Sequence, residues 1–200
     1  MSRARALKTN NAKPYHYGDL RAAAVAEGLR QIVHASNPSD LSLRHVAREI
    51  GVSPTALYRH FPDKDALLGA MASRGFDVLQ EAQRSAYGRG GKRGLTRAAR
   101  AYVRFAIANP ALFRMIFSAP LEQTHPFETP PEESAAAVLA EGVAAALGPR
   151  ARRATIHAAT IKAWTLVHGM AMLILHGQLR LADIDALIDK VISDDTLLPG

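Results

Sequence analysis

Apolar residues recur along this 200-residue chain at the three- and four-residue spacing of α-helices, and no segment alternates as a β-strand would. No internal repeat interrupts the pattern. The spacing predicts an all-α protein of about nine helices. We expect them near residues 17–34, 42–50, 53–61, 63–87, 95–108, 111–117, 131–147, 150–175 and 184–197.

Residues 41–68 hold the most informative pattern, two short helices joined by a tight turn. Leu43, Val46, Ala47 and Ile50 form one apolar face of the first helix, and Ser42 stands at its N-cap position. Residues 51 and 52 are Gly and Val, a pair that suits a left-handed helix end followed by an apolar residue packed on the core.

The second short helix begins at once, with Ser53 as N-cap and Pro54 in its first turn. Its apolar face consists of Leu57 and Phe61 only, Pro62 ends it, and Asp63 caps the next helix. The remaining positions of this helix therefore face outward: Thr55, Ala56, Tyr58, Arg59 and His60. Two helices joined by such a turn, with donors on the exposed face of the second, indicate a helix-turn-helix that reads DNA.

The run GVSPTALYRHFPDKDALL resembles the helix-turn-helix of the TetR family of transcriptional regulators. The matching positions are Gly51, Val52, Leu57, Tyr58, His60, Phe61, Lys64, Leu67 and Leu68. Further along, Trp164, His168 and Gly169 are similar to the Trp-x-x-x-His-Gly signature of one regulatory-domain subgroup of that family. The family's usual glycine before the second helix is replaced by the turn-forming residues 36–40.

The resemblance implies two domains. Residues 1–62 would form an arm and a three-helix DNA-binding domain, and residues 63–200 a linking helix with a helical ligand-binding and dimerisation domain. The family implies a homodimer; the apolar run 164–175 and the stripe of Ile184, Leu187, Ile188 and Val191 place its interface on the eighth and ninth helices, where Gly169 and Ala171 would admit a close partner helix.

DNA-binding candidates follow from the same residues. In the family, positions matching Thr55 and Ala56 approach base edges, whereas Tyr58, His60 and Lys64 suit phosphate contacts. Lys64 in the first turn of a helix opposes the helix dipole, which a nearby phosphate would explain. The full set is Tyr17, Ser42, Arg44, Ser53, Pro54, Thr55, Ala56, Tyr58, Arg59, His60 and Lys64. Each of these side chains could also be ordinary surface or half-buried packing.

The charge distribution supports a polyanionic partner. The formal net charge is +7, with +5 on residues 1–64, +6 on 65–120 and −4 on 121–200. The basic end is the helix-turn-helix end, which suits double-stranded DNA, although an anionic membrane surface would also attract it. The absence of cysteine excludes disulfides and fits a reducing cytoplasm. We expect no signal peptide and no membrane span, because the apolar run 163–175 is shorter than a bilayer requires.

Breaks in the pattern divide the rest of the chain. Residues 1–15 form a basic arm, GRGGKRG at 88–94 is expected to be a linker, and residues 118–133, with four prolines, are expected to be a loop. Arg97, Arg100 and Arg104 are most simply a solvated face of the fifth helix.

Aromatic residues of the second half suggest a pocket for a small, largely apolar or aromatic ligand. The candidates are Tyr102, Phe105, Phe113, Phe117, Trp164 and His168. Trp164 and His168 share a helical face, and a buried imidazole needs a hydrogen-bond partner. The alternative is that these side chains simply fill a core.

Chemistry beyond binding has little support. The eight histidines include no pair at helical metal-ligand spacing, and GRGGKRG lacks the Gly-Lys-Ser/Thr ending of a phosphate loop. We expect no metal, no cofactor and no catalytic residue. The sequence therefore predicts a cytoplasmic, homodimeric repressor that binds a nearly palindromic operator and is released by a small molecule. An architectural DNA-binding protein without a ligand is the alternative, and an enzyme is a more distant third.

Overall fold

The computed structural model describes residues 20–34, 41–118, 135–179 and 184–198, and this part of the chain folds into ten α-helices without a strand. The helices are α1 (Leu20–His34), α2 (Leu43–Glu49), α3 (Pro54–Tyr58), α4 (Lys64–Tyr87), α5 (Gly91–Ala108), α6 (Pro110–Ser118), α7 (Ala135–Leu147), α8 (Arg153–Leu175), α9 (Ile184–Val191) and α10 (Asp194–Leu197). The all-α prediction is confirmed. The basic arm, Tyr17, the loop 36–40 and nearly all of the Pro-rich segment lie outside the described residues.

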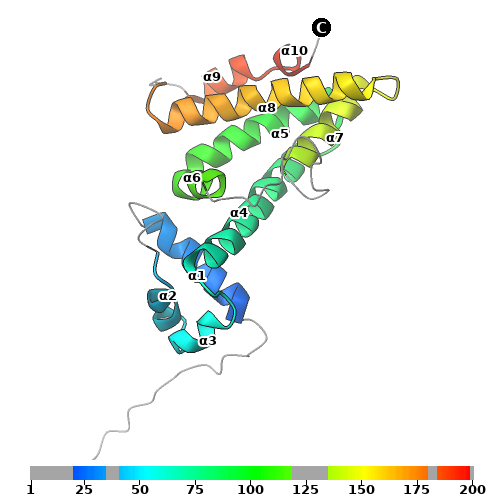
Figure 1. Cartoon of the computed structure of the whole chain (residues 1–200). Coiled ribbons are helices and arrows are strands. Elements are labelled where there is room, and N and C mark those ends of the chain that lie inside the picture. Colours follow the sequence, from blue (N-terminus) through cyan, green and yellow to red (C-terminus); the bar gives the residue numbers. More distant parts are fainter. Residues whose placement is uncertain (1–19, 35–40, 119–134, 180–183, 199–200) are drawn as a thin grey trace, which may run out of the picture.

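The long helix α4 joins two groups of helices (Figure 1). Its first half packs on α1 and α6, beside the short helices α2 and α3. Its second half packs on α5 and α7, which in turn support α8, while α9 and α10 lie against α5. One continuous apolar core runs through both groups, so α4 links the helix-turn-helix directly to the helices beyond it.

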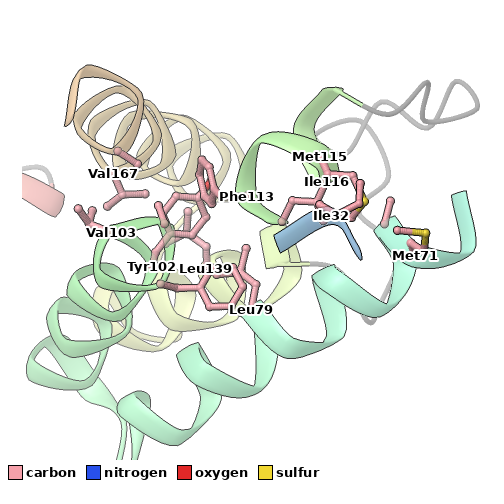
Figure 2. Close-up of a cluster of buried hydrophobic side chains, with 14 of the residues drawn as sticks. Ile32, Met71, Leu79, Tyr102, Val103, Phe113, Met115, Ile116, Leu139 and Val167 are labelled. Carbon is pink, nitrogen blue, oxygen red and sulfur yellow. The ribbon is translucent and has the colours of Figure 1, made fainter. Parts of the chain in front are cut away.

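The junction of α1, α4 and α6 is closely packed. Figure 2 shows Ile32 of α1 near Met115 and Ile116 of α6, and all three are at most 2% exposed. At Gly75 of α4, an added Cβ would stand 2.4 Å from Cγ2 of Ile116. Only a residue without a side chain therefore lets α6 approach α4 this closely, and α6 in turn contacts α1.

The connection between α4 and α5 is shorter than the glycine-rich segment 88–94 predicted. Residues 88–90 alone join α4 to α5, with positive φ at Gly88 and Gly90, whereas Gly91 already begins α5. Gly94 is buried in the first turns of α5, where a Cβ would stand 2.7 Å from the backbone oxygen of Tyr87. The expectation of a linker through residue 94 was wrong because some of these glycines serve close packing of α5 against α4.

The arginines of α5 do not form a simple solvated face, contrary to expectation. Arg97 Nε and Nη2 donate to the carbonyl oxygens of Ala86 and Tyr87 at the end of α4, both at 2.9 Å. Arg100 donates to the carbonyl oxygens of Ile192 and Asp189 at 3.0 and 2.9 Å. These guanidinium groups therefore fasten neighbouring helices to α5 while remaining partly accessible.

Arg104 binds α9 through carboxylates instead. Its Nε lies 2.8 Å from Oδ1 of Asp185, and its Nη2 lies 3.3 Å from Oδ1 of Asp189. The pKa of Arg104 is raised, chiefly by its hydrogen bond to Asp185.

The last predicted helix is two helices. Helix α9 ends at Val191, and Ser193 caps α10 through a capping box with Thr196. The hydroxyl of Thr96 on α5 also donates to the carboxylate of Asp194. A local cap and a long-range hydrogen bond thus end the helix that apolar spacing alone would continue.

Helix α8 carries two of the four large hydrophobic side chains that are exposed among the described residues. By length and composition alone, its 23 residues could cross a membrane. The core helix of a soluble protein meets the same criterion, and α8 packs on α5, α7 and α10. Ile161 and Leu173 are exposed, and nothing lies within 4 Å of a Cβ placed at Gly169. Ala171 is fully buried within its own chain, as is Ile188 on α9, so neither residue can form the partner-facing surface assigned to it from the sequence.

Candidate DNA-binding surface and aromatic interior

The turn between α2 and α3 has the geometry that its sequence predicts. Gly51 adopts a φ of 76°, and its N–H donates to the carbonyl oxygen of Arg48 at 3.1 Å. The N–H of Val52 donates to the carbonyl oxygen of Ala47 at 2.9 Å. These two bonds satisfy carbonyls at the end of α2 and bring Val52 onto the core. The chain can then start α3 two residues later at a fixed angle.

Helix α3 is held by a cap and two apolar anchors. The Ser53 hydroxyl accepts the N–H of Ala56 at 3.2 Å, and Pro54 occupies the first helical position. Leu57 is fully buried and Phe61 is 1% exposed. The guanidinium of Arg21 on α1 lies 5.2 Å from the Phe61 ring centroid, a cation–π distance. The buried side of α3 therefore fixes which side faces solvent.

The outward side of α3 is accessible. Tyr58 is 42% exposed, Thr55, Arg59 and His60 are exposed, and Ala56 is half-buried. Helix α3 is shorter than expected. It ends at Tyr58, and a turn follows in which the N–H groups of His60 and Phe61 donate to the carbonyl oxygen of Leu57. The exposed donors and the ring nevertheless lie on α3 and the turn that directly follows it.

The flanking candidates occupy helix starts. Ser42 is the N-cap residue of α2, but its side chain accepts no capping hydrogen bond, and Arg44 is exposed in the first turn. Lys64 opens α4 and is partly buried, beside Asp63, whose carboxylate accepts the N–H of Ala66 at 2.8 Å. Helix α4 begins six residues after α3 ends, and α2 packs on α3, so these candidates belong to the two helices that flank α3 in the sequence.

Five of the six predicted ligand-site residues gather between α5, α6 and α8. The rings of Phe113 and Phe117 lie 4.7 Å apart, and Tyr102 meets Phe113 edge-on at 5.5 Å. His168 stacks on Phe113 at 5.8 Å and contacts Phe117 at 4.7 Å. Trp164 stands 5.8 Å from His168, one turn away on α8. Ring contacts of this kind add to the apolar burial of the cluster.

Two hydrogen bonds run through this cluster. The Tyr102 hydroxyl and Nδ1 of His168 are 2.8 Å apart, and Nε1 of Trp164 donates to the same hydroxyl at 3.4 Å. The Tyr102 hydroxyl can therefore donate to Nδ1, which leaves the proton of a neutral imidazole on Nε2. Burial raises the pKa of Tyr102 and lowers the pKa of His168, so both groups stay neutral near pH 7.

Phe105 does not join the cluster. It is 7% exposed and lines a groove on the other side of α5, with Arg97, Arg100 and Arg104. Two further interior residues were not predicted from the sequence. Phe76 of α4 meets Phe117 edge-on at 5.4 Å, and its place on a helix of mixed polarity gave no signal. Gln83, on the same helix, is 2% exposed, and its side-chain oxygen has no partner among the described residues.

A metal site is not formed by the described residues, which contain no group of three His, Asp or Glu side chains able to hold an ion. These residues form an exposed helix, α3, that follows a tight turn, and a separate aromatic cluster between α5, α6 and α8. That combination defines the class: a helix-turn-helix DNA-binding protein with a second, helical part.

Comparison with known proteins identifies the family. Residues 31–71 match the model of bacterial regulatory proteins of the tetR family, and residues 95–194 match the tetracyclin repressor-like C-terminal domain. The chain belongs to the TetR family of transcriptional regulators, which are DNA-binding proteins and not enzymes. Its assignment to the Trp-His-Gly subgroup stays a prediction.

Solved structures share the fold over most of the chain. A protein of unknown function from Rhodococcus sp. RHA1 is 29% identical with a TM-score of 0.73, covering 93% of this chain and 97% of that one. A TetR family transcription regulator from Marinobacter aquaeolei VT8 is 21% identical, with a TM-score of 0.61 and coverage of 88% and 92%. TetR from Acinetobacter baumannii AYE is 16% identical, with a TM-score of 0.55 and coverage of 85% and 84%.

Proposed function

We propose that this chain is a cytoplasmic, homodimeric repressor that binds a nearly palindromic operator and is released by a small apolar or aromatic ligand. The observation that carries the proposal is the two-sided α3, anchored by Leu57 and Phe61 and exposed at Tyr58 and Arg59. A helix fixed in this way can enter the major groove without losing its own packing. Residues 1–62 would act as the DNA-binding unit and residues 63–200 as the regulatory unit.

The proposed contacts divide by what they reach. Thr55 and Ala56 would approach base edges, where a methyl group can contact thymine, and Arg59 would bind a base or a phosphate. Tyr58, His60 and Lys64 would bind the backbone and set the register of α3 in the groove. Tyr17, Ser42, Arg44, Ser53 and Pro54 complete the proposed footprint.

Selection of bound DNA from a random pool tests this reading first. We expect a palindrome whose half-sites lie one helical turn, or a multiple of it, apart. Arg59→Ala should then weaken operator binding and reduce the slope of log affinity against log salt by about one phosphate contact if Arg59 binds the backbone. Arg74→Ala is the control, because Arg74 is equally cationic but lies on α4, paired with Asp77. Full affinity in both Tyr58→Ala and Arg59→Ala would remove α3 from the interface.

The proposed ligand site is the aromatic cluster of Tyr102, Phe113, Phe117, Trp164 and His168. Its apolar rings favour an apolar or aromatic ligand, and Nε2 of His168 would be one of few polar groups able to orient it. Because Trp164 is the only tryptophan, its fluorescence reports on this site alone. Saturable changes with hydrophobic candidates, accompanied by lower operator affinity, are the expected result. A response of Trp164 to none of them would favour the architectural alternative.

The proposed dimer interface uses the exposed face of α8, with α9 beside it. Ile161 and Leu173 are 39% and 42% exposed, and Gly169 leaves open space between them. Light scattering should give a dimer mass at micromolar concentration. Ile161→Glu with Leu173→Glu should yield monomers, whereas Val78→Glu should not, because Val78 is equally exposed but lies on α4. A monomer mass for the unmodified protein would overturn this part of the proposal.

The proposed mechanism is a shift between two positions of α4. Ligand would favour the position in which the two α3 helices no longer match successive major grooves. The contact of α6 with both α1 and α4 supports this route, because α6 also supplies Phe113 and Phe117 to the ligand site.

A further inference from the structure

A groove of about 520 Å³ lies between α4, α5 and α9, outside the aromatic cluster. It is lined by Ala82, Ala86, Arg97, Arg100, Ala101, Arg104, Phe105, Ala108 and Asp189. We propose that this groove binds a small amphiphilic carboxylate, with the apolar body on the alanines and Phe105 and the carboxylate on the arginines. The site shares no residue with the proposed ligand cluster and does not depend on it.

The floor of the groove is apolar and consists mostly of small side chains. Four of its residues are alanines, from α4 and α5, and the only ring is that of Phe105. Small residues leave the volume open, so an aliphatic or aryl group would be withdrawn from water without displacing protein atoms. The volume falls within the range of small-molecule sites.

The residues that line the groove carry more positive than negative charge. Three guanidinium groups line it and Asp189 is the one carboxylate among the lining residues. Asp189 lies 3.3 Å from both Arg100 and Arg104 and is shared between them. Arg97 has no carboxylate within 4.0 Å in the described part of the chain; its bonds go to two neutral carbonyls. Asp185, which is not a lining residue, also pairs with Arg104 at 2.8 Å, so two carboxylates serve three guanidinium groups. A bound anion would therefore balance the charge that remains at Arg97.

The arginines keep donors for such an anion. A guanidinium carries five N–H groups. The hydrogen bonds of Arg97, Arg100 and Arg104 within the described residues use Nε and Nη2 of each side chain, and none uses Nη1. A carboxylate can accept from such groups in a paired, charge-assisted geometry. Their intramolecular bonds also hold the side chains in place, which lowers the entropy cost of binding.

Calorimetry on the full chain tests the site with three probes. Octanoate carries both an apolar tail and a carboxylate, 1-octanol keeps the tail, and acetate keeps the head group. We expect octanoate to bind at least about tenfold more tightly than either control, because a charge-assisted hydrogen bond and tail burial both contribute. Equal binding of octanol, or no binding of octanoate, would overturn the proposal.

Variants locate the bound octanoate. Arg97→Gln should weaken it about tenfold or more, whereas Arg114→Gln should not, because Arg114 donates likewise to a carbonyl, that of Leu175, but lies on α6 outside the groove. Ala101→Leu should block the groove while keeping all three arginines. Ala101 is partly exposed, so this variant is expected to fold even if Arg97→Gln loosens the end of α4. Unchanged affinity in Ala101→Leu, or loss of binding only in Trp164→Phe, would place octanoate in the aromatic cluster and refute the groove.

Discussion

The helix-turn-helix and the aromatic cluster are held together over very different lengths of chain. The turn bonds of Gly51, Val52 and Ser53 join residues three to five apart. In the cluster, Tyr102 reaches Trp164 and His168 across 62 and 66 residues. The first region can therefore be recognised from a short stretch of sequence. The second exists only once α5, α6 and α8 have been brought together, so a residue's type says little about its partner there.

The largest effect should come from the buried side of the helix-turn-helix. Phe61→Ala removes a ring that is 1% exposed and should cost about 3–5 kcal/mol of unfolding free energy. Tyr58→Ala, three residues away on the exposed side, should change stability by less than about 0.5 kcal/mol while weakening operator binding. Denaturant unfolding of both variants measures the contrast. Similar losses in the two would mean that α3 has no distinct inner and outer face.

The junction that joins the two regions should be the next most sensitive. Gly75→Ala places a Cβ 2.4 Å from Ile116, so α6 must shift, at a cost of about 1–3 kcal/mol. Gly69→Ala is the matched control on the same helix, since nothing lies within 4 Å of its Cβ, and it should stabilise by up to about 1 kcal/mol. Thermal unfolding of both proteins distinguishes the two signs. Stabilisation by Gly75→Ala would show that the α4–α6 contact is looser than described.

An interior polar group offers a smaller effect of opposite sign. Gln83→Met removes a buried side-chain oxygen without a partner among the described residues, in a side chain of similar shape. We expect stabilisation of about 1 kcal/mol, because the desolvation cost of that oxygen disappears. Gln178→Met, at an exposed position, should have no measurable effect. Destabilisation by Gln83→Met would reveal a hydrogen bond that holds the amide.

The smallest predicted effect is a pH dependence from the aromatic cluster. Burial lowers the pKa of His168 below its ordinary value of 6.5, so the unfolded chain takes up this proton first as the pH falls. The contribution of His168 to stability is thus complete above about pH 6.5, declines as the pH falls below that value, and levels off below the lowered pKa. His168→Gln should flatten this part of the unfolding profile. His157→Gln, on the exposed face of α8, should leave it unchanged, and a profile unaffected by His168→Gln would contradict the burial effect.

The sequence by itself determined the helical architecture, the cap and turn of the helix-turn-helix, the outward face of α3 and the family. These features depend on hydrogen bonds and periodicities that span only a few residues, so a short stretch of sequence is enough to predict them. Tyr102, Phe113, Phe117, Trp164 and His168 were also candidates from residue type alone, although that they meet was a consequence of packing.

The tertiary structure alone decided what covers each helix face. Phe105 lines the groove and not the aromatic cluster, and Ala171 is buried within its own chain. The arginines of α5 bind neighbouring helices, and α9 ends at Val191. Helical spacing tells which side of a helix is apolar but not which element packs on it. The partners of long arginine side chains are especially hard to predict. Arg100 donates to carbonyl oxygens 89 and 92 residues away, and every residue has a backbone carbonyl, so the residue type does not identify the acceptor.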